Sequence, residues 1–165
     1  KVLNGLKTKY HWVDKGSSFL LSDLLAAVLF SQLEMEEEIK SMRMRVTESY
    51  NILFNKLNYL PLKRMHFPEN CEVNHHAYWL VFDNTEKKDK FLKTIAKKNV
   101  FPYIGYTPLH SSPMGKNFGY KNKDLPITYD YGNRIIRLPF FNELNGELMK
   151  YCTNSIEESL KEIYE

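Results

Sequence analysis

The feature that most constrains this chain is the run LLAAVLF at residues 24–30, in which every side chain is apolar. Ser22 comes before the run and can accept a hydrogen bond from a free N–H group of a first helical turn. Asp23 then complements the positive end of the helix dipole. A helix that is apolar on every side is buried on every side. We therefore expect residues 24–30 to begin a helix that packs against a large body.

The apolar pattern continues beyond this run, but it narrows to one stripe. Apolar residues recur every three or four positions up to Leu57, with charged residues mostly between them. The stripe consists of Leu33, Ile39, Met42, Val46, Tyr50, Leu53 and Leu57. This spacing predicts one amphipathic helix over residues 22–57, which would be roughly 50 Å long at 1.5 Å per residue. A helix that is apolar all round at one end only is typical of a helix that joins two bodies.

The middle of the chain predicts strands on either side of a helix. The segment HAYWLVFD at residues 76–83 is rich in aromatic and β-branched residues, as in a buried strand. Thr85 is the predicted cap of a helix that ends near Asn99. Residues 100–106 are the next predicted strand.

The last third predicts a loop at residues 107–124, a helix at residues 128–137 and a short strand at residues 137–140. We expect this strand at the edge of the sheet, because Pro139 cannot donate to a ladder. Asn145 is the predicted cap of a final helix. The apolar stripe of that helix is Leu148, Cys152, Ile156, Leu160 and Ile163. The predicted fold class is α+β, a small sheet covered by helices mostly on one face.

Composition narrows the functional classes. The 165 residues are 43% hydrophobic, enough for one globular core, and the net charge is +3. A lysine-rich stretch at residues 87–98 is interpreted as a solvated face, because no nucleic-acid-binding motif accompanies it. Cys71 and Cys152 are far apart in the sequence, which favours a reducing, cytoplasmic location. No stretch of ~18 apolar residues predicts a membrane span.

No complete active site is visible from the residues alone. The five histidines lack metal-ligand spacing, so we expect no metal site. One segment that could bind a ligand is Gly16-Ser17-Ser18, where a flexible turn and two hydroxyls could surround a phosphate. The alternative is an ordinary capped turn.

A second such segment is YTPLHSSPMG at residues 106–115. Pro108 favours an extended backbone before it, which places His110 in a loop just after a strand. Binding residues are common in such loops. The alternatives are that His110 merely packs the loop and that Tyr106 packs the strand.

Taken in order, three segments resemble the sugar-nucleotide aminotransferases of the DegT/DnrJ/StrS type. The first is the GSSF turn at residues 16–19, followed by Ser22, Asp23 and the pairs Ala26-Ala27 and Gln32-Leu33. The second is YTPLHSSP, and the third is NRIIRLPF at residues 133–140. The resemblance extends over nearly the whole chain.

The resemblance implies the small C-terminal domain of a fold-type I enzyme that uses pyridoxal 5′-phosphate (PLP) and acts as a homodimer. Such an enzyme transfers an amino group from glutamate to a nucleotide-linked keto sugar, as in the synthesis of lipopolysaccharide or related glycans. It implies that residues 1–21 are a remnant of the large-domain boundary and that residues 22–165 are the small domain. The Schiff-base lysine belongs to the large domain, so no catalytic residue is expected in this chain, which would be inactive alone.

The resemblance also implies residue roles. Ser17 and Ser18 would bind the phosphate of the partner subunit's PLP, and His110 and Tyr106 would bind the substrate. Ser18 and Leu20 are closest to the branch that makes dTDP-4-amino-4,6-dideoxygalactose. Two alternatives stay open: a non-catalytic dimerisation or binding module, and a PLP-dependent sugar dehydratase in which histidine replaces the lysine.

Overall fold

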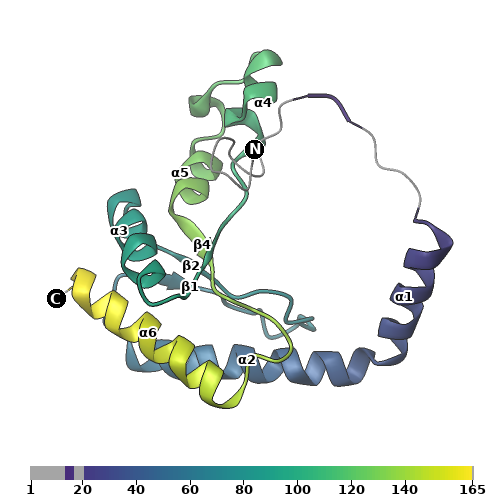
Figure 1. Cartoon of the computed structure of the whole chain (residues 1–165). Coiled ribbons are helices and arrows are strands. Elements are labelled where there is room, and N and C mark those ends of the chain that lie inside the picture. The colour runs from purple at the N-terminus through teal and green to yellow at the C-terminus, as the bar shows by residue number, and fades with distance from the viewer. Residues whose placement is uncertain (1–13, 17–20, 165) are drawn as a thin grey trace.

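In the part of the chain that the structure describes, four short strands form one antiparallel sheet with helices packed on one face (Figure 1). The computed structural model describes residues 14–16 and 21–164. The strands lie in the order β1-β2-β4-β3. Their bounds are Lys63–Arg64 for β1, Trp79–Val81 for β2, Tyr103–Ile104 for β3 and Ile135–Arg137 for β4. The predicted α+β class is confirmed.

Strand β4 differs from the prediction in both position and neighbours. It lies between β2 and β3 and ends at Arg137, whereas we expected an edge strand over residues 137–140. Pro139 follows the strand, so its missing N–H group does not interrupt the ladder. Ile136 is paired with Leu80 of β2, and both side chains are fully buried. On its other side β4 pairs with β3, where Ile104 lies opposite Ile136, so β4 is a central strand.

The predicted long helix is two helices. α1 spans Asp23–Glu34 and α2 spans Glu36–Lys56, with Met35 between them at φ −105° and ψ 18°. Three glutamates form the first turn of α2, where the positive end of the helix dipole favours them. In one continuous helix, Glu34 and Glu38 would be like charges four residues apart, which is unfavourable. The predicted cap of α1 is confirmed, since the Ser22 hydroxyl accepts from Leu25 N–H at 3.4 Å.

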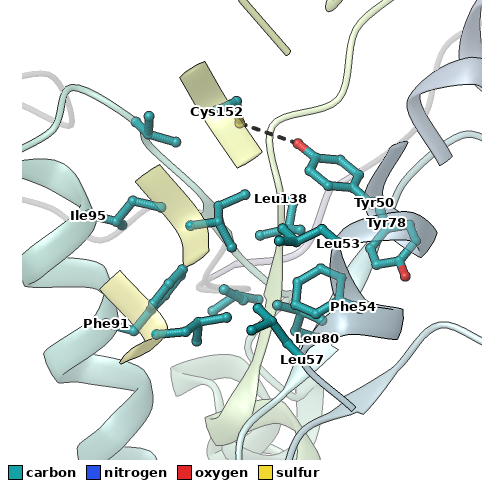
Figure 2. Packing of buried hydrophobic residues seen from close by; sticks show 14 of the residues in the cluster. Tyr50, Leu53, Phe54, Leu57, Tyr78, Leu80, Phe91, Ile95, Leu138 and Cys152 are labelled. Carbon is teal, nitrogen blue, oxygen red and sulfur yellow. Dashed lines mark hydrogen bonds between the residues drawn. The ribbon is translucent and has the colours of Figure 1, made fainter. Parts of the chain in front are cut away.

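The core lies between the sheet and three helices: α2, α3 (Thr85–Ala96) and α6 (Gly146–Tyr164). Figure 2 shows Tyr50 and Leu53 of α2, Phe91 of α3 and Cys152 of α6 in one cluster, with the Tyr50 hydroxyl directed toward Cys152. The Tyr50 hydroxyl donates to the Pro139 carbonyl at 2.7 Å and lies 3.5 Å from the Cys152 Sγ. Burial raises the pKa of both side chains, so Tyr50 and Cys152 are neutral in the folded protein.

Two details of the core helices differ from the prediction. The cap of α3 is Asn84 rather than Thr85, because the Asn84 side chain accepts from Lys87 N–H at 2.8 Å. In α6, Met149 takes the buried place that we assigned to Leu148, whose side chain is exposed. The stripe residues Cys152, Ile156 and Leu160 are buried as predicted, so only the first member of the stripe was wrong.

Helix α1 lies apart from this core. Figure 1 shows it at the end of α2, away from the sheet and from α6. Its apolar side chains are exposed, from 47% at Leu29 to 82% at Leu24. The expected burial of residues 24–30 is therefore absent within the described part of the chain.

Candidate functional site

His110 lies in a segment that is more regular than the predicted loop at residues 107–124. It sits in η1 (Leu109–Ser111), which runs directly into α4 (Pro113–Asn117). Ser112 is fully buried between the two and joins them. Its hydroxyl donates to the Leu109 carbonyl at 2.6 Å and accepts from Gly115 N–H at 3.4 Å. The sequence Ser-Pro is well suited to this junction, because serine caps a helix and proline fits its first turn.

Two glycines allow this segment to pack closely. A β-carbon at Gly115 would lie 2.1 Å from the Leu109 carbonyl oxygen and 2.8 Å from the His110 Cα. A β-carbon at Gly132, in α5 (Pro126–Arg134), would lie 2.4 Å from the Pro108 Cγ. Neither contact could form with a larger residue. The backbone that carries His110 is therefore held from both sides.

The His110 side chain is only 5% exposed. Its ring packs edge-on against Tyr129 of α5, with the ring centroids 6.4 Å apart. Its Nε2 atom is buried and has no hydrogen-bond partner among the described residues. A buried polar atom without a partner costs about 1–3 kcal/mol, so its presence calls for an explanation. A ligand that supplies the missing hydrogen bond would be one.

A cavity of about 560 Å³ opens beside His110. Its walls are mostly apolar and carry no charged side chain among the described residues. The lining residues are Leu109, His110, Gly115, Phe118, Tyr120 and Leu125. His110, Leu109 and Gly115 belong to the segment at residues 106–115 that the sequence indicated, whereas Phe118, Tyr120 and Leu125 were not predicted. The sequence signal for this wall was two aromatic residues, Phe118 and Tyr120, on either side of a glycine. In the structure this glycine, Gly119, has a φ of +88°.

Tyr106 occupies a different environment. Its side chain is 66% exposed, and the guanidinium carbon of Arg137 lies 5.3 Å from its ring centroid. It is not among the residues that line the cavity beside His110. The shared substrate-binding role of His110 and Tyr106 therefore stays a prediction.

Ser17 and Ser18, the predicted phosphate-binding residues, lie outside the described residues. The neighbouring Gly16 is exposed, and a β-carbon there would meet no atom within 4 Å. Two hydroxyl donors beside such an open backbone position fit the chemistry of a phosphate.

The other side chains show no metal-binding chemistry in residues 14–16 and 21–164. Within these ranges, no three of the His, Cys, Asp and Glu side chains are grouped so that they could hold a metal ion. No helix in the same ranges is both long and apolar enough to cross a membrane. Cys71 and Cys152 are both free thiols.

One protein-family model matches nearly the whole chain. The model of the DegT/DnrJ/EryC1/StrS aminotransferase family matches residues 3–157. The chain belongs to this family. The match includes both the GSS turn and the His110 segment, so both predicted binding segments are parts of the DegT/DnrJ/EryC1/StrS domain.

Curated relatives of this family are similar over most of the chain. The GDP-perosamine synthase of Escherichia coli O157:H7 is 29% identical over 154 residues, which cover 91% of this chain and 40% of that protein. The protein MJ1066 of Methanocaldococcus jannaschii is 26% identical over 161 residues, 93% of this chain and 40% of its own length. The chain thus spans about two fifths of the length of these relatives.

Solved structures of aminotransferases share the fold. The PLP form of the sugar aminotransferase Spr1654 from Streptococcus pneumoniae matches with a TM-score of 0.78 at 20% identity. The match covers 88% of this chain and 37% of that one. Helicobacter pylori PseC, an aminotransferase of pseudoaminic acid biosynthesis, matches with a TM-score of 0.75 at 19% identity over 95% of this chain and 43% of its own.

Proposed function

We propose that this chain is the C-terminal part of a PLP-dependent aminotransferase that acts on a nucleotide-linked 4-keto-6-deoxy sugar, with glutamate as the amino donor. The observation that carries the proposal is the family match over residues 3–157. The match covers only 40% of each of two longer relatives, and this supports the proposal because the rest of such a protein is long enough to form a further domain.

The exposed face of α1 supports a second body in the same enzyme. Burying apolar surface is favourable by roughly 25 cal/mol per Å², and a large exposed apolar patch is typical of an interaction site. Leu24, Leu25 and Phe30 are each more than half exposed. In the proposed enzyme, these side chains pack against the large domain. Residues 1–21 then form the boundary, and residues 22–165 form the small domain.

PLP supplies an electron sink that makes transfer of an amino group possible. This chain's part is to hold the cofactor's phosphate across a homodimer. The Ser17 and Ser18 hydroxyls donate to the phosphate of the partner subunit's PLP, and Gly16 lets the backbone approach. The lysine that bonds to the cofactor lies in the large domain, so the chain alone is inactive.

On the substrate side, His110 and Tyr106 bind the sugar nucleotide. The GSSF turn favours dTDP-4-amino-4,6-dideoxygalactose as the product. The name of the E. coli relative, GDP-perosamine synthase, indicates a nucleotide-linked product there too. The product would enter lipopolysaccharide or a related glycan, and the reaction would take place in the cytoplasm.

The absorbance of bound PLP in the full-length enzyme tests this function. Adding glutamate should bleach the visible band, and adding a dTDP- or GDP-linked 4-keto-6-deoxy sugar should restore it. Absence of both the visible band of PLP and the near-ultraviolet band of its amine form would rule out the cofactor. Loss of a sugar hydroxyl without amination of the product, in an enzyme that has histidine in place of the lysine, would instead establish the dehydratase alternative.

The phosphate role has a separate test in the same enzyme. The double variant Ser17→Ala/Ser18→Ala should lose PLP on dialysis faster than the wild-type enzyme. Ser31→Ala is the control, since among the described residues its hydroxyl donates to the Ala27 carbonyl of the same helix, at 3.1 Å. Equal PLP retention by the double variant and the wild-type enzyme would remove the two serines from the phosphate site.

A further inference from the structure

We infer that the face of the sheet opposite the core is a docking surface for the large domain of the proposed enzyme, where Arg137 forms an ion pair with a carboxylate of that domain. The inference rests on the proposed function and adds to it a second contact between the two domains, apart from α1. Three observations support it: the register of the sheet, the missing acceptor of Arg137 and the length of the relatives.

Three side chains form one row across the sheet. Trp79 of β2 and Tyr103 of β3 both lie opposite Arg137 of β4, and residues directly opposite each other share a face of the sheet. The next pair, Leu80 and Ile136, is fully buried in the core. Because side chains alternate along a strand, the row points away from the core. Tyr103 is 57% exposed, and the other two members are partly exposed, so the row is an accessible surface.

Arg137 lacks the acceptors that the other partly buried arginines have. The Arg43 guanidinium donates to main-chain carbonyls, and Arg134 forms an ion pair with Asp130. By contrast, the Arg137 Nε atom is buried without a hydrogen-bond partner, and no carboxylate among the described residues forms an ion pair with this guanidinium. The Tyr106 ring lies 5.3 Å from the guanidinium carbon, but it accepts no hydrogen bond from Nε.

A carboxylate is the acceptor that fits this guanidinium best. Arginine binds a carboxylate through two parallel N–H···O bonds, and its weakly hydrated guanidinium suits ion pairs at interfaces. Nε is the only Arg137 nitrogen that is both buried and without a partner, so the terminal nitrogens can be reached by an acceptor from outside the chain. A partly buried cation without an acceptor is unfavourable, so such a pairing stabilises the docked state.

The large domain is the occupant that the surroundings favour. The chain covers 40% of two relatives, so most of the proposed enzyme lies outside it. The face of a sheet packs against another layer of structure, whereas a small molecule binds in a hollow. The cavity beside His110 is lined by other residues and does not include Arg137. Contact at α1 and at this row would fix the large domain at two places.

The test compares Arg137→Met in the full-length enzyme and in the 165-residue chain. In the full-length enzyme, this variant should lower the Tm by more than ~3 °C, because a carboxylate at the interface loses its partner. The fall should be smaller in the 165-residue chain, where only the contact with the Tyr106 ring is lost. Arg45→Met is the matched control, because Arg45 is exposed and donates to the Ser41 hydroxyl of its own helix at 3.0 Å.

A cross-link identifies the partner of Arg137. Arg137→Lys keeps the charge and should recover part of the Tm that Arg137→Met loses. A carbodiimide joins the new amine to a carboxylate in direct contact with it. Peptide mass spectrometry of the treated full-length enzyme should then find position 137 joined to an aspartate or glutamate of the large domain.

Three results would overturn the inference. The first is an equal fall in Tm in both proteins, and the second is a cross-link from position 137 to a carboxylate within residues 1–165. The third is an Arg137→Met enzyme that keeps its Tm but has a higher KM for glutamate or for the sugar nucleotide, since the arginine would then bind a substrate. The proposed function is judged separately, by whether glutamate bleaches PLP in the wild-type enzyme, so the two can fail independently.

Discussion

Gly132 lies so close to Pro108 that the ring of the proline occupies the space of a side chain, and a β-carbon on the glycine would lie only 2.4 Å from the proline Cγ. Gly132 is inside α5, where alanine would normally stabilise a helix by about 1 kcal/mol. We predict the opposite sign here. Gly132→Ala should lower the free energy of unfolding by about 1–3 kcal/mol, because the new methyl group overpacks the contact. Urea unfolding measures the change.

The control for this variant is Gly16→Ala, since a β-carbon at Gly16 meets nothing within 4 Å and its backbone is not left-handed. It should leave the free energy of unfolding within ~0.5 kcal/mol of the wild-type value. A stabilised Gly132→Ala variant would mean that Pro108 moves aside at little cost and that the glycine does not position His110.

The cap of α3 gives a test between two adjacent residues. Asn84→Ala should lower the free energy of unfolding by about 1 kcal/mol, because it removes the acceptor for Lys87 N–H. Thr85→Ala, at the position that the sequence pattern favoured, should change it by less than ~0.5 kcal/mol. Thermal melts of the two variants under the same conditions check the order. A larger effect at Thr85 would restore the sequence-based prediction.

Alanine substitutions at Leu24 and Leu160 compare how an exposed and a buried leucine contribute to the free energy of unfolding. Leu160 of α6 is fully buried, and Leu160→Ala should cost about 2–5 kcal/mol of unfolding free energy. Leu24 of α1 is 82% exposed, so Leu24→Ala in the 165-residue chain should change stability by less than ~0.5 kcal/mol. If the large domain covers Leu24 as proposed, Leu24→Ala should become clearly destabilising in the full-length enzyme. An equal, negligible effect in both proteins would contradict the proposed packing.

Stability should fall in acid because of Asp83. Burial raises the pKa of this carboxyl, but hydrogen bonds from Lys87 and Tyr164 outweigh it, and the net pKa lies below the ordinary 3.8. The Lys87 Nζ lies 2.7 Å and the Tyr164 hydroxyl 2.8 Å from the carboxylate. A lowered pKa means that the unfolded chain takes up the proton first. The stabilisation is therefore present above about pH 4 and lost as the pH falls through the folded-state pKa.

Urea unfolding at pH 7 and pH 3 tests this dependence. Asp83→Asn should reduce the difference in stability between the two pH values, and Tyr164→Phe should reduce it by a smaller amount, since Lys87 remains. If Asp83→Asn kept the full wild-type difference, the acid sensitivity would belong to other carboxylates.

A structural feature was predicted correctly from the sequence where a single local effect determines it. Ser22 was correctly predicted as a cap because serine before an apolar run has few other roles. The stripe Val46, Tyr50 and Leu53 was correctly assigned to the core, since a repeat of three to four residues defines one helix face. The three family motifs led to the same assignment that the family match confirms.

Other features depended on contacts that the sequence does not show. The break at Met35 was not predicted, because the apolar stripe continues on both sides of it. The position of β4 depends on Ile136 meeting Leu80, a pair 56 residues apart. Gly132 lies inside α5 although glycine weakens a helix, and the Pro108 ring fills the space that a side chain would take there. Tyr106 was grouped with His110 through the family resemblance; its ring lies beside Arg137, and the shared role stays a prediction.

The close packing at Gly115 and Gly132 also has a consequence for how such domains diversify. Neither position can gain a side chain without displacing the backbone around His110. The exposed side chains Phe118, Tyr120 and Leu125 can change with much less disturbance. We therefore expect paralogues that evolve new ligand preferences to differ mainly in these three side chains, while retaining the rigid frame behind them.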